Sequence, residues 1–139
     1  MNMILQRTIK LVIKPTEEQK QILLETLEQY KYAYNYVCKV GWEAQIWNGV
    51  KLHKLTYYNI KSETSLPSQL IISARMVASE SLKSAIKRKK KGLKSSCPES
   101  KNPAIRYDKR SYTVWLYREE VSIATIEGRL KFKVKIPDY

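Results

Sequence analysis

The pattern of apolar and polar residues changes its period twice along the chain. Residues 8–14, TIKLVIK, alternate apolar and mostly basic side chains, which predicts a strand. Thr16 and Gln19 then have the spacing of a capping box, and apolar residues recur at helical spacing behind it. This predicts a long helix over about 17–46. After position 103 the period returns to two. The chain therefore reads as a strand, a helical block and further strands.

Two more helices are expected inside the helical block. The Asn-Gly pair within 47–50 is a turn signal that ends the first helix. Residues 51–63, KLHKLTYYNIKSE, are interpreted as a short helix. The next helix has Ser65 or Leu66 at its cap and Pro67 in its first turn, where the missing N–H is harmless. Its buried stripe is predicted to contain Leu70, Ala74, Val77, Ala78, Leu82 and Ala85.

The remaining chain is predicted to form a linker and three strands. Residues 93–103 contain Ser and Pro and follow a glycine stop at Gly92. Strands are expected at 111–117, 121–126 and 129–136, the last two joined by a tight turn at Glu127-Gly128. Alone, the strand at the N-terminus would expose unpaired edges, so we expect it to pair with these strands.

The expected fold is therefore α+β. A small β-barrel or twisted antiparallel sheet is predicted from residues 1–14 and 103–139. A helical domain, residues 15–102, is inserted between its two parts and ends in the basic linker.

The net charge of the chain narrows the range of possible binding partners. The chain of 139 residues has 26 Lys and Arg against 13 Asp and Glu, a formal net charge of +13. Such an excess repels itself unless a polyanion neutralises it, which favours nucleic acid first and an anionic membrane surface second. No apolar run approaches the roughly 18–20 residues of a spanning helix, and the opening MNMILQRTIK does not resemble a signal peptide. Cys38 and Cys97 lie far apart, so a disulfide framework or zinc site is not expected, and a reducing cytoplasmic setting fits best.

The sequence lacks the residue clusters of an enzyme. Two-metal phosphodiester cleavage needs clustered acids, but the aspartates are Asp108 and Asp138, 30 positions apart. There is no Gly-rich phosphate loop, no His/Cys nucleophile pair and no helix with two histidines. We therefore expect a chain that is not catalytic by itself and needs no cofactor.

Two groups of cations are candidates for phosphate contacts. RLKFKVKI, 129–136, alternates cations with apolar residues, so the cations would stand about 6.6–6.8 Å apart on one face. A solvated strand face is the alternative, although mixed charge would serve solubility equally well. KRKKK, 87–91, is either a solvated helix end or a phosphate contact, and its residues point around the helix. Trp115 and Tyr117 lie opposite Tyr112 in strand register and are the better candidates for stacking on bases.

Three stretches resemble the TnpB (OrfB) proteins of bacterial and archaeal insertion sequences. They are IKLVIKPTEEQKQILLETLEQYKYAYNYV, with its Tyr34-Asn35 pair, LPSQLIISARMVASESLKSAIKRKKKG, and IRYDKRSYTVWLYREEVSIATIEGRLKFKVKIP. The order is that of the family and spans nearly the whole chain. We expect Tyr34-Asn35 to anchor its helix to the barrel.

The resemblance implies the N-terminal part of an RNA-guided DNA endonuclease. In that family a wedge barrel with an inserted recognition domain grips guide RNA, the guide–target heteroduplex and a short DNA motif. In the family a later RuvC-like domain cleaves the DNA, and we expect this chain to end where that domain would begin. A free-standing repressor-like DNA binder and a general structured-RNA binder remain alternatives.

The expected contacts form one continuous cationic track over the sheet and the helices. It comprises Lys10, Lys14, Lys87, Arg88, Lys89, Lys90, Lys91, Arg106, Lys109, Arg110, Arg129, Lys131, Lys133 and Lys135, with Trp115 and Tyr117 as stacking residues.

Overall fold

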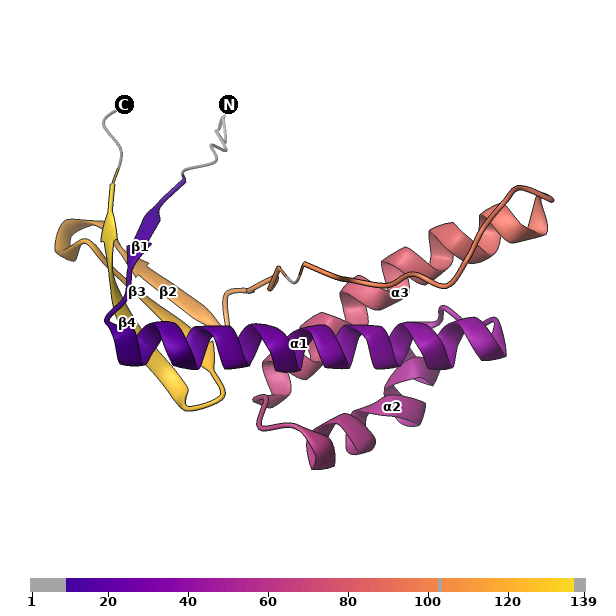
Figure 1. The fold of residues 1–139 in the computed structure, drawn as a ribbon, viewed down its shortest axis with the longest axis horizontal. Helices are drawn as coiled ribbons and strands as arrows, with labels where there is room; N and C mark the ends of the chain where they lie inside the picture. The colour runs from indigo at the N-terminus through magenta and orange to yellow at the C-terminus, as the bar shows by residue number, and fades with distance from the viewer. Residues whose placement is uncertain (1–9, 103, 137–139) are drawn as a thin grey trace, which may run out of the picture.

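The computed structural model of the protein describes residues 10–102 and 104–136. Its elements, in chain order, are β1 (Val12–Lys14), α1 (Glu17–Ala44), α2 (Gly49–Glu63), α3 (Ser68–Lys90), β2 (Tyr112–Trp115), the 3-10 helix η1 (Leu116–Arg118), β3 (Glu120–Thr125) and β4 (Gly128–Lys135). The predicted α+β fold is confirmed. The sheet stands at the N-terminal end of α1, and the C-terminal end of α3 lies at the far end of the molecule (Figure 1).

The strands form one open antiparallel sheet in the order β1-β4-β3-β2. Of the two forms expected, the twisted sheet is therefore correct and the closed barrel is not. Strand β1 pairs with β4, with Ile13 opposite Val134. This pairing confirms the prediction that the first strand pairs with the C-terminal strands. Residues 8 and 9 of the expected first strand lie outside the described residues.

Strand β4 has the alternation that its sequence predicts. Phe132 and Val134 are buried on one face, and the cations between them are exposed. Leu23 of α1 packs against this buried face, which also contains Val121 of β3. At the start of the same helix, the Gln19 side-chain amide donates to the Lys131 carbonyl oxygen at 2.8 Å. The first turns of α1 thus hold the sheet, because the apolar face of β4 needs a cover.

The predicted capping box of α1 is present, with reciprocal hydrogen bonds between Thr16 and Gln19. The end of the helix differs from the expectation. Gln45 adopts the left-handed conformation at φ 54°, and its N–H bonds back to carbonyl oxygens of the last turn. Asn48 instead caps α2, because its Oδ1 accepts from the Lys51 N–H at 3.1 Å. The Asn-Gly pair therefore starts a helix here rather than ending one.

Helix α2 confirms the expected short helix, and α3 begins later than expected. Pro67 is its N-cap, so Ser65 and Leu66 lie outside the helix. The Ser65 N–H donates to the Gln29 Oε1 of α1 at 2.7 Å, which holds this residue in the connection before α3. The buried stripe also shifts by part of a turn: Leu70, Ala74, Ala78 and Leu82 are buried as predicted, Ile71 and Ile86 join them, and Val77 and Ala85 are only half-buried.

The three helices share one core, in which Gly41 allows a close approach of α1 and α3. A Cβ at Gly41 would overlap with Leu82 Cδ1 of α3 and lie 2.8 Å from the Ile46 carbonyl oxygen. The Ile46 N–H in turn donates to the Gly41 carbonyl oxygen at 2.8 Å. This glycine therefore fixes how tightly the end of α1 packs on α3.

The strand expected at 111–117 is shorter than predicted. Strand β2 ends at Trp115, and residues 116–118 form the 3-10 helix η1 before Glu119 turns the chain at φ 52°. In the β3–β4 hairpin Thr125 pairs with Gly128, whose φ is 89°. The turn is thus one residue earlier than expected, at 126–127, and the left-handed conformation of Gly128 starts β4.

The linker after α3 is anchored although it contains no helix or strand over 93–102. Asn35 holds it by a reciprocal pair of hydrogen bonds with the Ser100 backbone, at 2.8 and 3.1 Å. The neighbouring Tyr34 hydroxyl bonds to Ser81 of α3 at 2.9 Å. The Tyr34-Asn35 pair therefore joins α1 to α3 and to the linker. The expected anchor to the sheet is wrong, because both side chains lie on the part of α1 that faces α3.

Candidate nucleic-acid interface

The exposed face of the sheet gathers lysines from two neighbouring strands. We call it the lysine face: Lys14 of β1 together with Lys131, Lys133 and Lys135 of β4, all exposed. Lys14 lies directly opposite Lys133 in the β1–β4 ladder. Residues opposite each other in an antiparallel pair point to the same face, so the first strand extends the row of cations on β4 sideways. The predicted alternation thus produces a two-strand cationic surface.

Strand β4 is an inner strand, with β1 and β3 on its two sides. Its lysines therefore do not serve to protect a free sheet edge from aggregation, which is one common reason for lysine on a strand. Glu120 of β3 lies opposite Lys133 and is the one acidic side chain that the four described strands place on this face. The lysine face consequently keeps a net positive charge.

Trp115 lies on the lysine face, as its register predicted. It is opposite Glu120 in the β2–β3 ladder. Lys131 Nζ lies 5.4 Å from the centre of its ring, and the Arg118 guanidinium lies 5.6 Å away. The same guanidinium is 5.5 Å from the Tyr117 ring, which is 80% exposed. This side of the sheet therefore combines cations with accessible aromatic surface.

Arg118 is a functional candidate that the sequence pattern alone did not reveal. The pattern places it in the connection between two strands, and its proximity to both aromatic rings depends on the 3-10 turn of η1. Its position next to two stacking candidates in the sequence is the signal that could have identified it. Cations beside an aromatic ring are a common feature of nucleic-acid surfaces.

Several predicted cations have partners within the protein. Arg129 donates to the Arg110 carbonyl oxygen at 3.0 Å and to Thr113 Oγ1 at 2.8 Å, which ties β4 to the loop before β2. Arg106 forms an ion pair with Glu80 of α3 at 2.7 Å. The remaining predicted residues of this part, Lys10, Lys109 and the Arg110 side chain, are exposed. Arg106 and Arg129 thus have structural contacts that the sequence did not reveal.

The second group of cations lies at the C-terminal end of α3. We call Lys87, Arg88, Lys89, Lys90 and Lys91 the helix-end cluster; all five are exposed. Lys89 Nζ lies 5.1 Å from the Trp42 ring centre, and Lys90 Nζ lies 5.0 Å from that of Trp47. The two tryptophans, from the end of α1 and the connection after it, hold two of the five cations in place.

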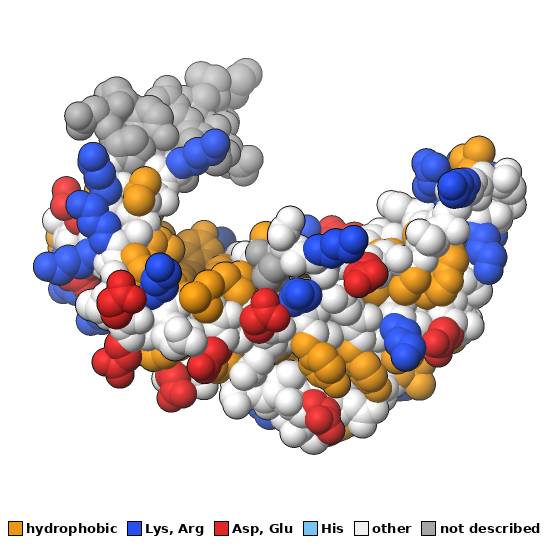
Figure 2. Space-filling model, viewed as in Figure 1, with side chains coloured by type: hydrophobic (Ala, Val, Ile, Leu, Met, Phe, Trp, Pro, Cys, Tyr) orange, Lys and Arg blue, Asp and Glu red, His pale blue; other side chains and the backbone are white. Residues whose placement is uncertain are grey.

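The cations form two groups on the visible face rather than one continuous track. Figure 2 shows blue side chains at the sheet end and at the end of α3, and scattered blue and red side chains over the body between them. The body also contains the ion pairs Lys31–Glu28, at 3.9 Å, and Arg106–Glu80. The expected continuous track is therefore wrong on this face, because acidic and uncharged side chains separate the cations of the body.

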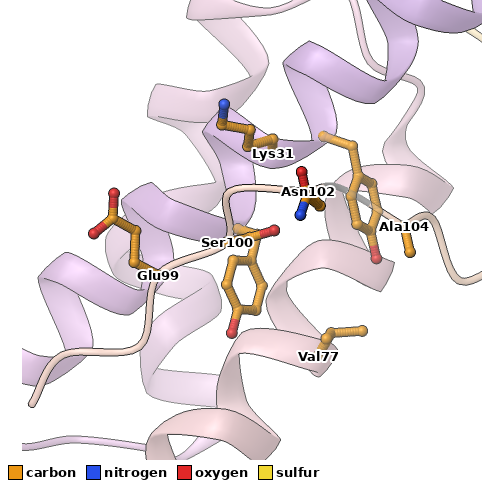
Figure 3. A pocket seen from close by; sticks show the side chains of 8 residues that line it. Lys31, Val77, Glu99, Ser100, Asn102 and Ala104 are labelled. Atoms are coloured by element: carbon orange, nitrogen blue, oxygen red, sulfur yellow. The ribbon is translucent and has the colours of Figure 1, made fainter.

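A cavity of about 270 Å³ lies between α1, α3 and the linker. Lys31 comes from α1, Val77 from α3, and Glu99, Ser100 and Asn102 from the linker (Figure 3). Its charged residues have opposite signs, so it offers no concentration of positive charge for a phosphate. The lysine face and the helix-end cluster remain the candidate surfaces.

Both thiols are held in the protonated form at neutral pH. Burial raises the pKa of Cys38 to about 12. Burial also raises the pKa of Cys97, whose Sγ lies 3.5 Å from the Cys38 carbonyl oxygen. A protonated thiol is a poor nucleophile and a poor metal ligand. Within residues 10–102 and 104–136 no three His, Cys, Asp or Glu side chains gather as a metal site, and no helix is long and apolar enough to cross a membrane.

Residues 1–39 match the family model of a helix-turn-helix domain of the OrfB proteins of IS605 elements. The N-terminal part of the chain is OrfB-like. The resemblance to TnpB and OrfB proteins is thereby confirmed for this segment. No curated protein and no solved structure matches the chain.

The described part of the OrfB-like segment, 10–39, contains β1 and one uninterrupted stretch of α1. A helix-turn-helix needs two helices joined by a short turn. In chain order, the first such connection among the described residues is 45–48, between α1 and α2. Among the described residues, the match therefore contains a single helix, and α2 lies beyond it.

Proposed function

We propose that the chain binds nucleic acid through phosphate contacts of the lysine face, with the helix-end cluster as a second contact surface. The OrfB-like segment supports DNA as a ligand and a role in a transposon-associated protein. The formal net charge of +13 supports a polyanionic partner.

The lysine face is the observation on which this proposal depends. Its lysines come from two hydrogen-bonded strands, so their backbone positions are fixed by the ladder rather than by flexible loops. Along β4 they stand about 6.6–6.8 Å apart, close to the separation of successive phosphates on a strand of nucleic acid. A solvated face would be served by mixed charge, whereas Glu120 is the one acid among the described strands on this face.

At a finer level, we propose that the chain is the nucleic-acid-binding portion of an RNA-guided DNA endonuclease. In this role it would hold guide RNA, the guide–target heteroduplex and a short DNA motif beside the target. The resemblance of three stretches of the sequence to TnpB proteins, with a family-model match over residues 1–39, supports this. A surface that can recognise the nucleic-acid backbone without reading sequence supports it as well. Guide pairing would then supply most of the specificity.

A salt titration tests the proposal. Fluorescence polarisation with labelled duplex DNA should give an affinity that falls steeply with salt, because each neutralised phosphate releases counterions. Six contacts correspond to a log–log slope near −5, at roughly −0.9 for each contact. A flat salt response would rule out phosphate binding.

Two further measurements separate the finer proposal from its alternatives. RNA that co-purifies with the protein should be a transposon-encoded guide rather than ribosomal RNA or tRNA. A footprint on one duplex DNA sequence in the absence of RNA would instead indicate a repressor-like DNA binder.

A further inference from the structure

We propose that helix α2 presents its outer face to the major groove of double-stranded DNA. This inference rests on the proposed function and adds a third contact surface, distinct from the lysine face and the helix-end cluster. The three buried residues of α2, Leu52, Thr56 and Ile60, form a single stripe against the other helices. The opposite side of the helix is open.

The open side of α2 has the charge that a DNA ligand requires. Lys51, Lys54 and Lys61 follow one another at spacings of three and seven residues and fall on one face, opposite the buried stripe. No ion pair involves them among the described residues. Lys61 Nζ lies 3.3 Å from Ser68 Oγ, a contact with a neutral group. The acid of this helix, Glu63, is its last residue. The charge of the outer face is therefore not neutralised within the protein.

The same side exposes apolar surface that a merely solvated helix would not need. Tyr58 is 76% exposed, Val50 67% and Leu55 49%, and Tyr58 lies between the lysines on the helix surface. In the major groove, apolar side chains contact the thymine methyl group while cations reach phosphates and guanine edges. A helix with mixed basic and apolar residues on its free face matches this chemistry.

The position of α2 in the chain also supports binding in the major groove. The four-residue connection 45–48 joins it to α1, as in a helix-turn-helix, where the second helix enters the major groove. Its 15 residues extend over roughly 22 Å at 1.5 Å per residue, enough to cross a groove about 12 Å wide. The helix therefore has the length and the connection that this docking mode requires.

An additional cation stands at the first turn of α2. Arg75 of α3 lies beside Gly49, and its Nε is buried with no hydrogen-bond partner among the described residues. An open pocket of about 210 Å³ here is lined by Arg75, Val50, His53 and Lys54. A DNA phosphate next to this turn would be near two cations, Arg75 and Lys54, and near the positive end of the helix dipole.

The test uses the 139-residue chain, a duplex DNA of about two helical turns and a duplex RNA of the same length. The variant Leu55→Ala/Tyr58→Ala changes no charge, so a general loss of attraction cannot explain its effect. We expect roughly tenfold weaker binding to the DNA, within the range for base-edge contacts. Binding to the RNA should be unchanged, because the major groove of an A-form duplex is too narrow to admit a helix.

The chain offers a matched control in Leu24→Ala. Leu24 of α1 is 48% exposed, close to the 49% of Leu55, and lies on another helix. This control should bind both duplexes as the wild type does. The second variant, Lys54→Gln/Lys61→Gln, removes two expected phosphate interactions. It should therefore make the DNA salt slope shallower by roughly 1.8 and leave the RNA slope unchanged. Thermal melts of all variants verify that they are folded.

The outcomes separate the two proposals. Suppose that the wild type binds DNA. If the α2 variants bind the DNA equally well, or if they lose the same affinity for the DNA and the RNA duplex, the α2 inference is wrong and the proposed function stands. If the wild type binds neither duplex, the proposed function fails, and the α2 inference fails with it.

Discussion

The lysine face and the helix-end cluster are both strongly basic, but they are built differently. On the sheet, the side chains alternate along β4 and are continued by Lys14 of β1, so all of them point to one face. At the end of α3 five successive cations follow the helical turn, and they point in different directions. The sheet therefore presents its charge to one ligand surface, whereas the helix end spreads it.

The comparison extends to the aromatic residues. Trp115 is itself a strand residue on the lysine face, in contact with Lys131. At the helix end Trp42 and Trp47 come from another helix and its connection, and they hold Lys89 and Lys90. The helix-end contact thus depends on the packing of α3 against α1, and the sheet contact depends on its own ladder. This difference yields predictions for each surface.

The largest effect is expected for Lys131→Gln/Lys133→Gln/Lys135→Gln. Removing three phosphate-binding cations should make the salt slope shallower by roughly 2.7 and lower DNA affinity by about two to three orders of magnitude near 0.1 M salt. The loss of affinity should be the same for all DNA sequences, since phosphate contacts carry no sequence information. Fluorescence polarisation over a salt series measures both quantities.

A matched control replaces three exposed lysines outside both surfaces, Lys20→Gln/Lys39→Gln/Lys83→Gln. It has the same net charge as the sheet variant. If the two triple variants lose equal affinity, binding depends on total charge, and the lysine face has no special role.

Gly41→Ala tests the close packing of α1 on α3, on which the helix-end cluster depends. The added Cβ would overlap with Leu82 Cδ1 and approach the Ile46 carbonyl oxygen at 2.8 Å. We expect the free energy of unfolding to fall by about 2 kcal/mol, as for other overpacked core sites. Chemical denaturation measures it. Ser84→Ala, exposed on α3, should stay within about 0.5 kcal/mol of the wild type, and an unchanged stability of Gly41→Ala would contradict the close helix contact.

A smaller effect is expected at the helix end itself. Lys89→Gln/Lys90→Gln should lower DNA affinity by about tenfold or less and make the salt slope shallower by at most roughly 1.8, because divergent side chains cannot all reach one duplex. The same polarisation assay measures it. If the loss of DNA affinity for each substituted lysine is larger at the helix-end cluster than on the lysine face, the proposed ranking of the two surfaces is wrong.

The effect that is smallest near neutral pH concerns the Cys38 thiol of the helical core. Because burial raises the pKa of Cys38 to about 12, the thiol ionises more readily in the unfolded chain. Its contribution to stability is complete below the ordinary thiol pKa and is lost as pH rises towards 12. Stability should therefore fall from about pH 8.5 upward, by at most roughly 1.4 kcal/mol for each pH unit. Unfolding curves of Cys38→Ala should show a weaker decrease; an equal decrease would exclude this thiol as its cause.

Much of the fold could be predicted because local chemistry and tertiary packing agree there. The Thr16–Gln19 capping box starts α1, and the alternation in β4 has the predicted buried and exposed faces. Predictions failed where a distant partner decides the outcome. The Gln29 side chain of α1, for example, satisfies the Ser65 N–H outside α3. The end of α1 is a different case, because Gln45 adopts the left-handed conformation through bonds within its own last turn.

The candidate site could be predicted only in part, for the same reason. Which residues lie on one face of β4 follows from period two, and so does the side on which Trp115 lies. The ion pair of Arg106 with Glu80 and the hydrogen bonds of Arg129 depend on contacts across the chain. Such contacts separate cations that are available to a ligand from those that stabilise the protein.

Lysine reactivity with and without duplex DNA tests the central claim most directly. After mild acetylation, mass spectrometry reports how accessible each lysine is. Bound DNA should protect Lys14, Lys131, Lys133 and Lys135, while Lys39 and Lys83 on the outer surfaces of α1 and α3 should react as in the free protein. Unchanged reactivity of the lysine face in the presence of bound DNA would contradict the account.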